Sequence, residues 1–510
     1  MHMLQKKVSL LVLILPLLLV QSSISHPQED SFIQVEGCTT ALAAGNATSD
    51  GTIVLAKNRD LSEYEIQWLY RAPREYHPTG ARLKLQYIEI PQVEVTWAWV
   101  GSKSYTKKWG VGMGINEWGV VVADNDASTR ETLEGERGLH DNDICRLILE
   151  RSKNAREGMQ VAGALLEEYG HSFVGEIYWI ADSEEAWIVE GAGHHWAAVK
   201  ITDGVAVRAN QFQITTHWDA GSEDLVEYAI SKGWCKSAED FNFARCYSKI
   251  GYPYKSSQTR FERGNNLLEA KVGGLTRQDL MEVLADHYEG TYRYNTAHDN
   301  SDYRTTCNKR TVSAMVAHLR PETPSEMQVM WYCMSSPCIG IFMPVYANIS
   351  AIPVPYLTGS APEDISNYDE ASAWWAFKKI QLLVDEDYDE RHAMVRAGWD
   401  ELYNGFVSDI NQFEQEIQSL YSAGEKEEAR SKMDSFVEQK LNEAYDSALQ
   451  TIKELTGAEE VIEEEPSGDM PENGDEEQDN KTFMYLVVFA FMALIAGALL
   501  LYVARTRSNT

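Results

Sequence analysis

Gly37-Cys38-Thr39-Thr40-Ala41-Leu42-Ala43-Ala44-Gly45 is a short apolar run, and Thr52-Ile53-Val54-Leu55-Ala56-Lys57-Asn58-Arg59-Asp60 is a second one that follows it closely. The sequence Thr48-Ser49-Asp50-Gly51 separates them, and an Asp-Gly turn between two apolar runs predicts a β-hairpin. Such a hairpin returns the charged end of the second run to the neighbourhood of Cys38. A thiol beside a cation and a carboxylate is the setting of an activated cysteine nucleophile.

The chain has seven cysteines, and a disulfide is the alternative role for Cys38 because secreted proteins mostly use cysteine in that way. An odd number of cysteines leaves one thiol over. We expect Cys38 to be that thiol, with as many as three bridges among the other six. Those six are Cys145, Cys235, Cys246, Cys307, Cys333 and Cys338.

The first 37 residues have the pattern of a leader that is removed. Lys6 and Lys7 precede an apolar run over residues 8–20, and Ser23-Ile24-Ser25 offers a small-residue cleavage site. We therefore interpret residues 1–25 as a secretory signal peptide. The polar residues 26–37 would remain ahead of Cys38, and we interpret them as a propeptide.

An uncharged apolar run of 23 residues covers positions 482–504, and it is long enough to cross the ~30 Å hydrocarbon core as one helix. Residues 457–481 before it are rich in acidic side chains and predict an extended, disordered stalk. Arg505 and Arg507 follow it in a tail of residues 505–510, and cationic residues favour the cytoplasmic side. The sequence thus predicts a single-pass protein of the cell membrane with its body outside.

Residues 38–360 have the pattern of strands arranged around a pair of helices. Runs at 93–99, 109–122, 177–181, 186–190, 196–201 and 205–209 predict strands joined mainly by hairpins. Helical periodicity lies between them, around Ile144 and Leu147 and again around Val161 and Leu165. This order favours an α+β fold with antiparallel sheets. Residues 361–456 are predicted to form a helical extension.

Composition and motifs exclude several classes of site. The formal net charge is −32 and no basic block is present, which argues against nucleic acid as a partner. Cys333 and Cys338 stand five apart and predict a disulfide or core packing rather than a metal knuckle. Four histidines invite a metal interpretation, but none has a zinc-ligand spacing, so we expect no metal and no cofactor. These histidines are His171, His194, His195 and His217.

Five short motifs occur in order along the body, and together they resemble the C69 dipeptidase family, which includes secernin-like proteins. They are Cys38-Thr39-Thr40, Ala56-Lys57-Asn58-Arg59-Asp60, Gly114-Ile115-Asn116-Glu117-Trp118-Gly119-Val120, Arg208-Ala209-Asn210-Gln211 and Ser256-Ser257-Gln258-Thr259-Arg260-Phe261. The resemblance covers residues 38 to 380, and the chain is more distantly similar to the choloylglycine hydrolase and penicillin V acylase family. Both families are N-terminal-nucleophile (Ntn) hydrolases, so the resemblance implies a four-layer αββα core.

The resemblance implies that Cys38 becomes the first residue of the mature chain when the Gly37–Cys38 bond is cut. Its freed α-amino group, with an ordinary pKa of about 7.7–8.0, would serve as the base for its own thiol. Asp60 matches the carboxylate that orients this amino terminus. Lys57 stands where the acylases carry an arginine and the secernin-like relatives a lysine; Arg59 is the other candidate for that role.

Three further residues complete the implied site. Asn210 matches the asparagine of the oxyanion hole, whose side-chain amide would donate to the developing negative charge. Asn125 is the nearest candidate for the second donor. Arg260 matches the arginine that supports the nucleophile and its carboxylate network.

The resemblance implies an enzyme that hydrolyses dipeptides or other short peptides through an acyl-enzyme. Two alternatives stay open: a hydrolase of linear N-acyl amides, and a surface scaffold that keeps the fold without catalysis, which the lysine at position 57 mildly favours. Also open are a homo-oligomer as the assembled state and the agent of maturation, the protein itself or another protease.

Overall fold

The computed structural model describes residues 37–457, apart from residues 108, 132, 134–137, 173, 301 and 361–368. The predicted signal peptide, the propeptide up to residue 36, the stalk from residue 458, the span at 482–504 and the tail lie outside these residues. Within the described part of the chain, no helix is both long and apolar enough to cross a membrane.

The predicted first hairpin forms the centre of an antiparallel sheet of six strands. Its strands are β1 (Thr39–Ala44) and β2 (Ile53–Asp60), and every residue of both is buried. The sheet order is β14-β1-β2-β16-β17-β18, so β2 lies between the hairpin partner β1 and a strand from far along the chain. The other four are β14 (Gly204–Arg208), β16 (Thr311–Leu319), β17 (Val329–Met334) and β18 (Met343–Tyr346).

A second antiparallel sheet has eight strands in the order β15-β13-β12-β11-β10-β9-β8-β3. The predicted strands at 177–181, 186–190 and 196–201 are present in it as β11, β12 and β13, and the hairpin around Asn116 and Glu117 is present as β9 and β10. The bounds are β3 (Gln67–Ala72), β8 (Trp99–Ser104), β9 (Met113–Asn116), β10 (Val121–Ala127), β11 (Gly175–Ala181), β12 (Ala186–Ala192), β13 (His195–Ile201) and β15 (Ala220–Gly221).

The strand expected at 93–99 is only partly present, because β7 (Val95–Thr96) is short and the next strand, β8, begins at Trp99. The backbone N–H of Trp97 donates to the Glu150 carbonyl (3.0 Å), and that of Ala98 donates to the Glu117 carboxylate (2.8 Å). These two groups therefore bond to a helix and a side chain instead of a neighbouring strand. Three further short strands pair outside the main sheets: β4 (Glu75–Tyr76), β5 (Arg82–Lys84) and β6 (Glu89–Pro91).

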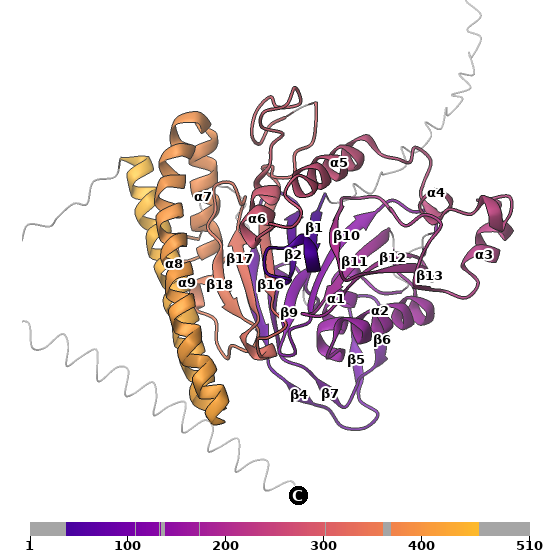
Figure 1. Ribbon diagram of the computed structural model, residues 1–510, viewed down its shortest axis with the longest axis horizontal. Helices are drawn as coiled ribbons and strands as arrows, with labels where there is room; N and C mark the ends of the chain where they lie inside the picture. Colours follow the sequence, from indigo (N-terminus) through magenta and orange to yellow (C-terminus); the bar gives the residue numbers. More distant parts are fainter. Residues whose placement is uncertain are drawn as a thin grey trace, which may run out of the picture. The chain divides into compact units, whose positions relative to one another are not determined.

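Helices cover the outer face of each sheet, which gives the four layers of an αββα sandwich (Figure 1). The helices α1 (Asp141–Arg151) and α2 (Ala155–Tyr169) pack on β9 to β13 of the eight-stranded sheet. On the opposite side, α5 (Lys255–Glu269) and α6 (Arg277–Ala285) pack on β1, β2, β14 and β16. Two short helices, α3 (Leu225–Ser231) and α4 (Phe243–Tyr247), lie in the connection between these pairs.

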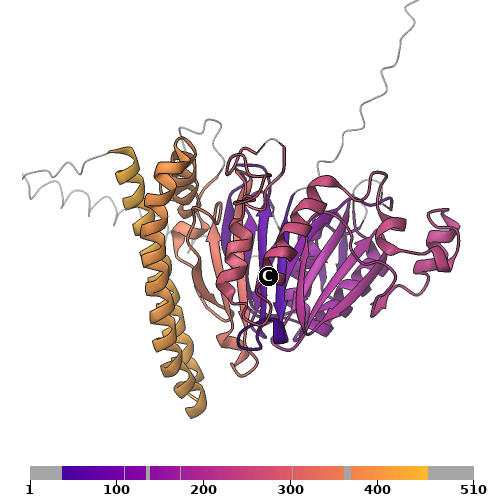
Figure 2. The ribbon, with the colours of Figure 1, turned by 45° about the horizontal axis from the view of Figure 1, so that its top comes forward.

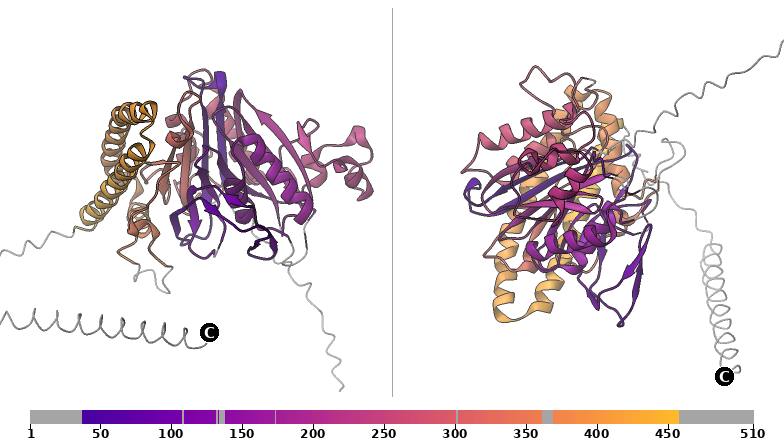
Figure 3. Two further views of the ribbon diagram at one scale, coloured as in Figure 1. Left: turned by 90° about the horizontal axis from the view of Figure 1, so that it is seen from below. Right: turned by 90° about the vertical axis from the view of Figure 1, so that its right-hand side faces the viewer.

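Three C-terminal helices pack on the β17–β18 side of the six-stranded sheet: α7 (Ala373–Asp385), α8 (Tyr388–Ala423) and α9 (Lys426–Thr456). Figure 2 shows the indigo first hairpin between the salmon strands next to these helices and the magenta strands of the eight-stranded sheet. The left view of Figure 3 shows the orange and yellow helices beside the salmon strands. The architecture is therefore α+β with C-terminal helices, as the sequence predicts.

No disulfide joins the seven cysteines, all of which lie in the described part of the chain and are buried free thiols. The expected bridges among six of them are thus not present. The sulfur atoms of Cys307 and Cys338 lie 3.5 Å apart.

Candidate active site

Cys38 immediately precedes β1, at the end of the central hairpin where β2 finishes. The register pairs Thr39 with Asn58, so Cys38 lies beside the last two residues of β2, Arg59 and Asp60. Side chains alternate along a strand, and Thr40, on the same face as Cys38, contacts Asn125 of the other sheet. The thiol therefore faces the space between the two sheets, and its residue is only 5% exposed.

The alternation along β2 divides its charged end into two groups. Asn58 and Asp60 point away from the eight-stranded sheet, and the Asn58 amide donates to the carbonyls of Leu284 and Thr306. Lys57 and Arg59 point toward that sheet and reach Asp124 on β10. A strand in the sheet centre can thus supply one side of the site with cations and the other with a carboxylate.

Asp60 is fully buried and is held by three donors from one segment that leads into β16. Arg304 Nη2 and Asn308 Nδ2 each lie 3.0 Å from Oδ2, and Thr311 Oγ1 lies 2.7 Å from Oδ1. Arg304 Nη2 also donates to the carbonyl of Gly37 (3.0 Å). The predicted carboxylate is therefore linked through Arg304 to the peptide bond that precedes Cys38.

Arg260 approaches Cys38 from α5, on the outer side of β1. Its Nη1 donates to the Cys38 carbonyl (2.8 Å) and to Thr39 Oγ1 (3.0 Å), and its Nη2 donates to Asn210 Oδ1 (2.8 Å). Burial, together with the charge of Arg304, lowers the pKa of Arg260 to about 10. The guanidinium thus joins two of the predicted site residues, Cys38 and Asn210.

Asn210 and Asn125 are both present near β1, in different settings. The Asn210 side chain accepts from Arg260 and donates to the carbonyl of Asp126 (3.0 Å), so its orientation is fixed from both ends. Asn125 Oδ1 accepts from Thr40 Oγ1 (2.8 Å) and Trp179 Nε1 (2.9 Å), while its Nδ2 is buried without a hydrogen-bond partner. A buried donor without a partner lowers the stability of the protein. Asn125 Nδ2 is therefore available to an oxygen atom of a ligand.

Lys57 is fully buried and forms an ion pair and hydrogen bond with the carboxylate of Asp124. Arg59 lies 3.6 Å from the same carboxylate and donates to Asn142 Oδ1 (2.8 Å). Gly112 makes room for the guanidinium, because a Cβ there would lie 1.2 Å from Arg59 Nη1. Of the two candidates for the cationic role, Lys57 is paired inside the sandwich and Arg59 reaches the adjoining cavity.

Burial raises the pKa of the Cys38 thiol, and this effect outweighs the charge of Lys57, which lowers it. Asp60 and Asp126 raise the pKa and Arg59 lowers it. The sequence correctly predicts the direction of the lysine effect but misses the larger effect of burial. A thiol in this state is protonated near neutral pH and needs a base to become a nucleophile.

A cavity of about 420 Å³ adjoins these residues, with charged groups of both signs in its wall. Its cationic and imidazole groups come from Arg59, Lys107, His140 and His171. Its acidic groups are Glu65, Asp126 and Asp141. Such a site suits a small ligand that carries both charges.

Asp126 and Asp141 form a group with Glu176, and one oxygen from each lies within 4.8 Å of the others. Burial, with the charge of Asp126, raises the pKa of Glu176 well above its ordinary value. Burial also opposes ionisation of Asp141, but His140 beside it lowers the pKa of that carboxyl overall. The group therefore combines carboxyls whose pKa values are shifted in opposite directions, and the charge of Asp126 acts on the Cys38 thiol.

The family model of peptidase family C69 matches residues 37–261 and 267–401 of this chain. The chain belongs to peptidase family C69. Among curated relatives, "Probable dipeptidase B" of Lactococcus lactis subsp. lactis (strain IL1403) is 25% identical over 400 residues, covering 69% of this chain and 82% of the relative. "Probable dipeptidase" of Salmonella dublin is 24% identical over 362 residues, covering 62% of this chain and 82% of the relative.

Solved structures also resemble this C69 chain at low overall similarity. A mutant of the conjugated bile acid hydrolase from Clostridium perfringens is 15% identical with a TM-score of 0.35, covering 58% of this chain and 89% of that one. Penicillin V acylase from Agrobacterium tumefaciens is 13% identical with a TM-score of 0.34, covering 61% and 86%.

Sequence reasoning did not identify Arg304, Asn308 or Thr311 as part of the C69 site. They lie more than 240 positions from Asp60, and no local motif marks them. The pairing of β2 with β16 is what brings them to the carboxylate. Of the four histidines considered as metal ligands, His195 stacks on Tyr228 with 3.8 Å between ring centroids.

We expect Arg260→Met to lower kcat/KM by about 10- to 100-fold, because it frees Asn210 and the Cys38 carbonyl from their shared donor. Peptide hydrolysis assays measure the loss. Arg245→Met is the matched control, since Arg245 pairs with Asp240 at the surface and is 47% exposed at its side chain. Equal losses in both variants would contradict a role specific to Arg260.

The thiol of Cys38 should react with iodoacetamide more slowly at neutral pH than an ordinary thiol, and its rate should rise with pH beyond the ordinary thiol range. The reason is the raised pKa, which shifts the thiolate to higher pH. Site-specific rates come from mass spectrometry of labelled peptides across a pH series. A rate midpoint below that of an unstructured cysteine peptide would contradict the expected direction.

Proposed function

We propose that this C69 protein hydrolyses dipeptides with Cys38 as an N-terminal nucleophile. The observation that carries the proposal is that two arginines donate hydrogen bonds to the carbonyls of residues 37 and 38, one arginine to each. Arg304 holds the Gly37 carbonyl together with Asp60, and Arg260 holds the Cys38 carbonyl together with Asn210. A purely structural turn has no need for buried ionic groups on both sides of one peptide link.

Cleavage of the Gly37–Cys38 bond would convert the amide nitrogen of Cys38 into an amine. This amine would take the thiol proton, and the thiolate would attack the substrate carbonyl carbon. Asn210 and Asn125 are the donors proposed for the resulting oxyanion. The protonated amine would then give its proton to the leaving amino group, and water would hydrolyse the thioester to release the second product.

The charges of the cavity wall favour a zwitterionic substrate. Asp126 and Asp141 line the cavity and, with the buried Glu176, form an acidic group suited to the substrate's α-ammonium. Lys107 lines the same cavity as a partner for a carboxylate. Two curated relatives are named probable dipeptidases, which agrees with this assignment. A hydrolase of N-acyl amides, the alternative activity, would gain nothing from an acidic group at this position.

We also propose the processing and topology that the ends of the chain suggest. Residues 1–25 would be removed as a signal peptide and residues 26–37 as a propeptide. Residues 482–504 would anchor the protein in the cell membrane with residues 38–456 outside and the tail in the cytoplasm. The amino-terminal residue of protein recovered from membranes tests the first part: Cys38 is expected, and a start near His26 would remove the proposed base.

Cys38→Ser should lower kcat by about 1,000-fold or more while dipeptide binding, measured by calorimetry, is retained. The control is Cys235→Ser, which alters another buried thiol in a different part of the core and should leave kcat within about twofold. Unchanged turnover in Cys38→Ser would refute the mechanism. Binding without turnover in the wild-type protein would favour the scaffold alternative.

Asp126→Asn should raise KM for free dipeptides by about tenfold and reduce the preference for them over N-acetylated dipeptides. Glu65→Gln is the matched control, because it removes a carboxylate from the same cavity outside the acidic group. Kinetics on one dipeptide with and without an N-acetyl group measure the effect. A wild-type enzyme that prefers the acetylated form would favour the N-acyl hydrolase.

A further inference from the structure

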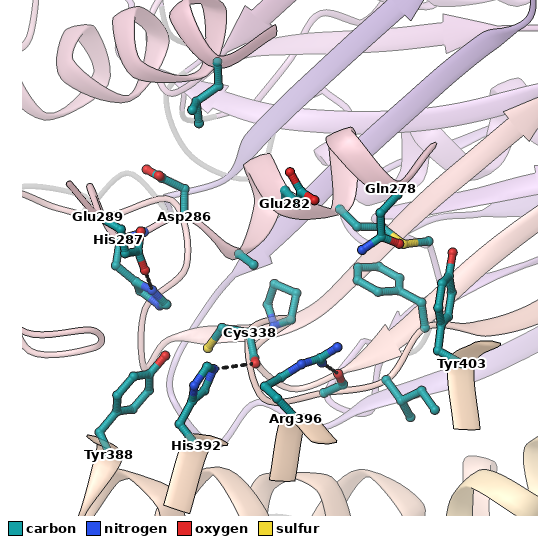
Figure 4. Close-up of a pocket in the computed structure, with 17 residues that line it drawn as sticks. Gln278, Glu282, Asp286, His287, Glu289, Cys338, Tyr388, His392, Arg396 and Tyr403 are labelled. Carbon is teal, nitrogen blue, oxygen red and sulfur yellow. Dashed lines mark hydrogen bonds and ion pairs between the residues drawn. The ribbon is translucent and has the colours of Figure 1, made fainter. Parts of the chain in front are cut away.

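Two histidines and two cysteines from two connecting segments of the six-stranded sheet lie close together. His287, His298 and Cys307 lie in the connection between α6 and β16, and Cys338 follows β17. One ligand atom from each lies within 4.8 Å of all the others, and the four residues are between 0% and 9% exposed. Figure 4 shows His287 and Cys338 at one end of an adjoining pocket of about 430 Å³.

Three distances between the ligand atoms are close to the edges of a zinc tetrahedron. The Cys307 and Cys338 sulfurs are 3.5 Å apart, and His298 Nε2 lies 3.1 Å from the Cys338 sulfur and 3.8 Å from the Cys307 sulfur. Ordinary Zn–S and Zn–N bond lengths predict edges of about 3.3–3.8 Å for a tetrahedral site with two sulfur and two nitrogen ligands. His287 Nε2 completes the set within 4.8 Å of the other three ligand atoms, so small side-chain movements would let all four reach one metal ion.

Both imidazoles are oriented as metal ligands usually are. His287 Nδ1 lies 2.7 Å from Glu289 Oε1, and His298 Nδ1 lies 2.6 Å from Asp385 Oδ1. A carboxylate on one ring nitrogen fixes the tautomer and leaves the other nitrogen available to a metal. His287 Nε2 is buried and has no hydrogen-bond partner, so it is a polar atom that the protein alone leaves unsatisfied.

We propose that His287, His298, Cys307 and Cys338 bind one structural Zn²⁺ through the two Nε2 atoms and the two sulfurs. Two thiolates and two neutral imidazoles neutralise a divalent cation, which is what burial of the charge requires. Four protein ligands leave no open position, so the metal would hold structure rather than take part in the reaction.

The proposed zinc would stabilise the segment that supplies hydrogen bonds to Asp60. Cys307 is followed directly by Asn308, whose amide donates to Asp60 (3.0 Å), and Asp385, the partner of His298, belongs to α7. The metal would therefore fix the segment that holds the buried carboxylate and connect it to the C-terminal helices. Ten, eight and thirty residues separate the successive ligands, so the sequence contains none of the short paired spacings of zinc motifs.

A disulfide between Cys307 and Cys338 is the competing use of the two sulfurs in a secreted protein. Their 3.5 Å separation compares with about 2.05 Å in a disulfide. A disulfide would also leave both inward-facing imidazole nitrogens without a ligand. The geometry therefore favours the metal.

The first test is the metal content of the full-length protein, purified without chelators and without a histidine tag and analysed by plasma mass spectrometry. About one zinc per chain is expected, with release of that zinc when the thiols are titrated with a mercurial. Protein in which Co²⁺ replaces zinc should show the visible absorption of a tetrahedral cobalt–thiolate site. Absence of stoichiometric metal, with a Cys307–Cys338 disulfide recovered in non-reduced peptides, would overturn the proposal.

Cys338→Ser and His298→Gln should each reduce bound zinc by at least about tenfold and lower the Tm of the purified protein. Cys333→Ser is the matched control, since Cys333 is a fully buried cysteine outside the cluster. The Cys333→Ser protein should bind as much zinc as the wild-type protein. Where a ligand variant fails to fold, the metal content and cobalt spectrum of the wild-type protein still decide. Unchanged zinc in a folded Cys338→Ser variant would refute the site.

Discussion

The structure depends on the fully buried carboxyl group of Asp60 at the end of the central strand. A buried charge is tolerated only when it is paired and hydrogen-bonded, and here Arg304, Asn308 and Thr311 supply the partners. These donors come from the segment that enters β16, so the carboxylate requires β16 to lie beside β2. Arg304, one of these donors, also donates to the Gly37 carbonyl. The pairing of β16 with β2 therefore also fixes the position of the peptide bond that precedes Cys38.

The alternation of side chains along β2 explains how one short strand serves two sides of the site. Lys57 and Arg59 face the eight-stranded sheet and neutralise Asp124, whereas Asn58 and Asp60 face the loops below α6. Because both sheets cover the thiol, burial dominates its pKa, and the nearby cations only moderate that effect. The proposed amine base follows from this balance: a buried thiol without a strong activating charge needs a proton acceptor.

The predictions made from sequence were most accurate where the signal is local. The hairpin of residues 37–60, the strands at 177–201 and the α+β class follow from alternation and turn residues, and all are present. The strand expected at 93–99 was wrong in extent, because its backbone bonds to Glu150 and Glu117, which no local pattern reveals. The expected disulfides are absent among the seven cysteines, all of them described; two of these lie instead in a cluster with histidines.

The sequence by itself determined the central hairpin, and its short motifs marked Cys38, Asp60, Asn210 and Arg260 as candidate site residues. Of these, Arg260 contacts both Cys38 and Asn210, and Arg304 contacts Asp60. Only the tertiary structure decided which residues surround them: Arg304 and Asn308, the acidic group around Asp126, and the cluster around His287. The physical reason is that antiparallel pairing and helix packing join residues with no neighbouring sequence in common, so their chemistry exists only after the chain has folded.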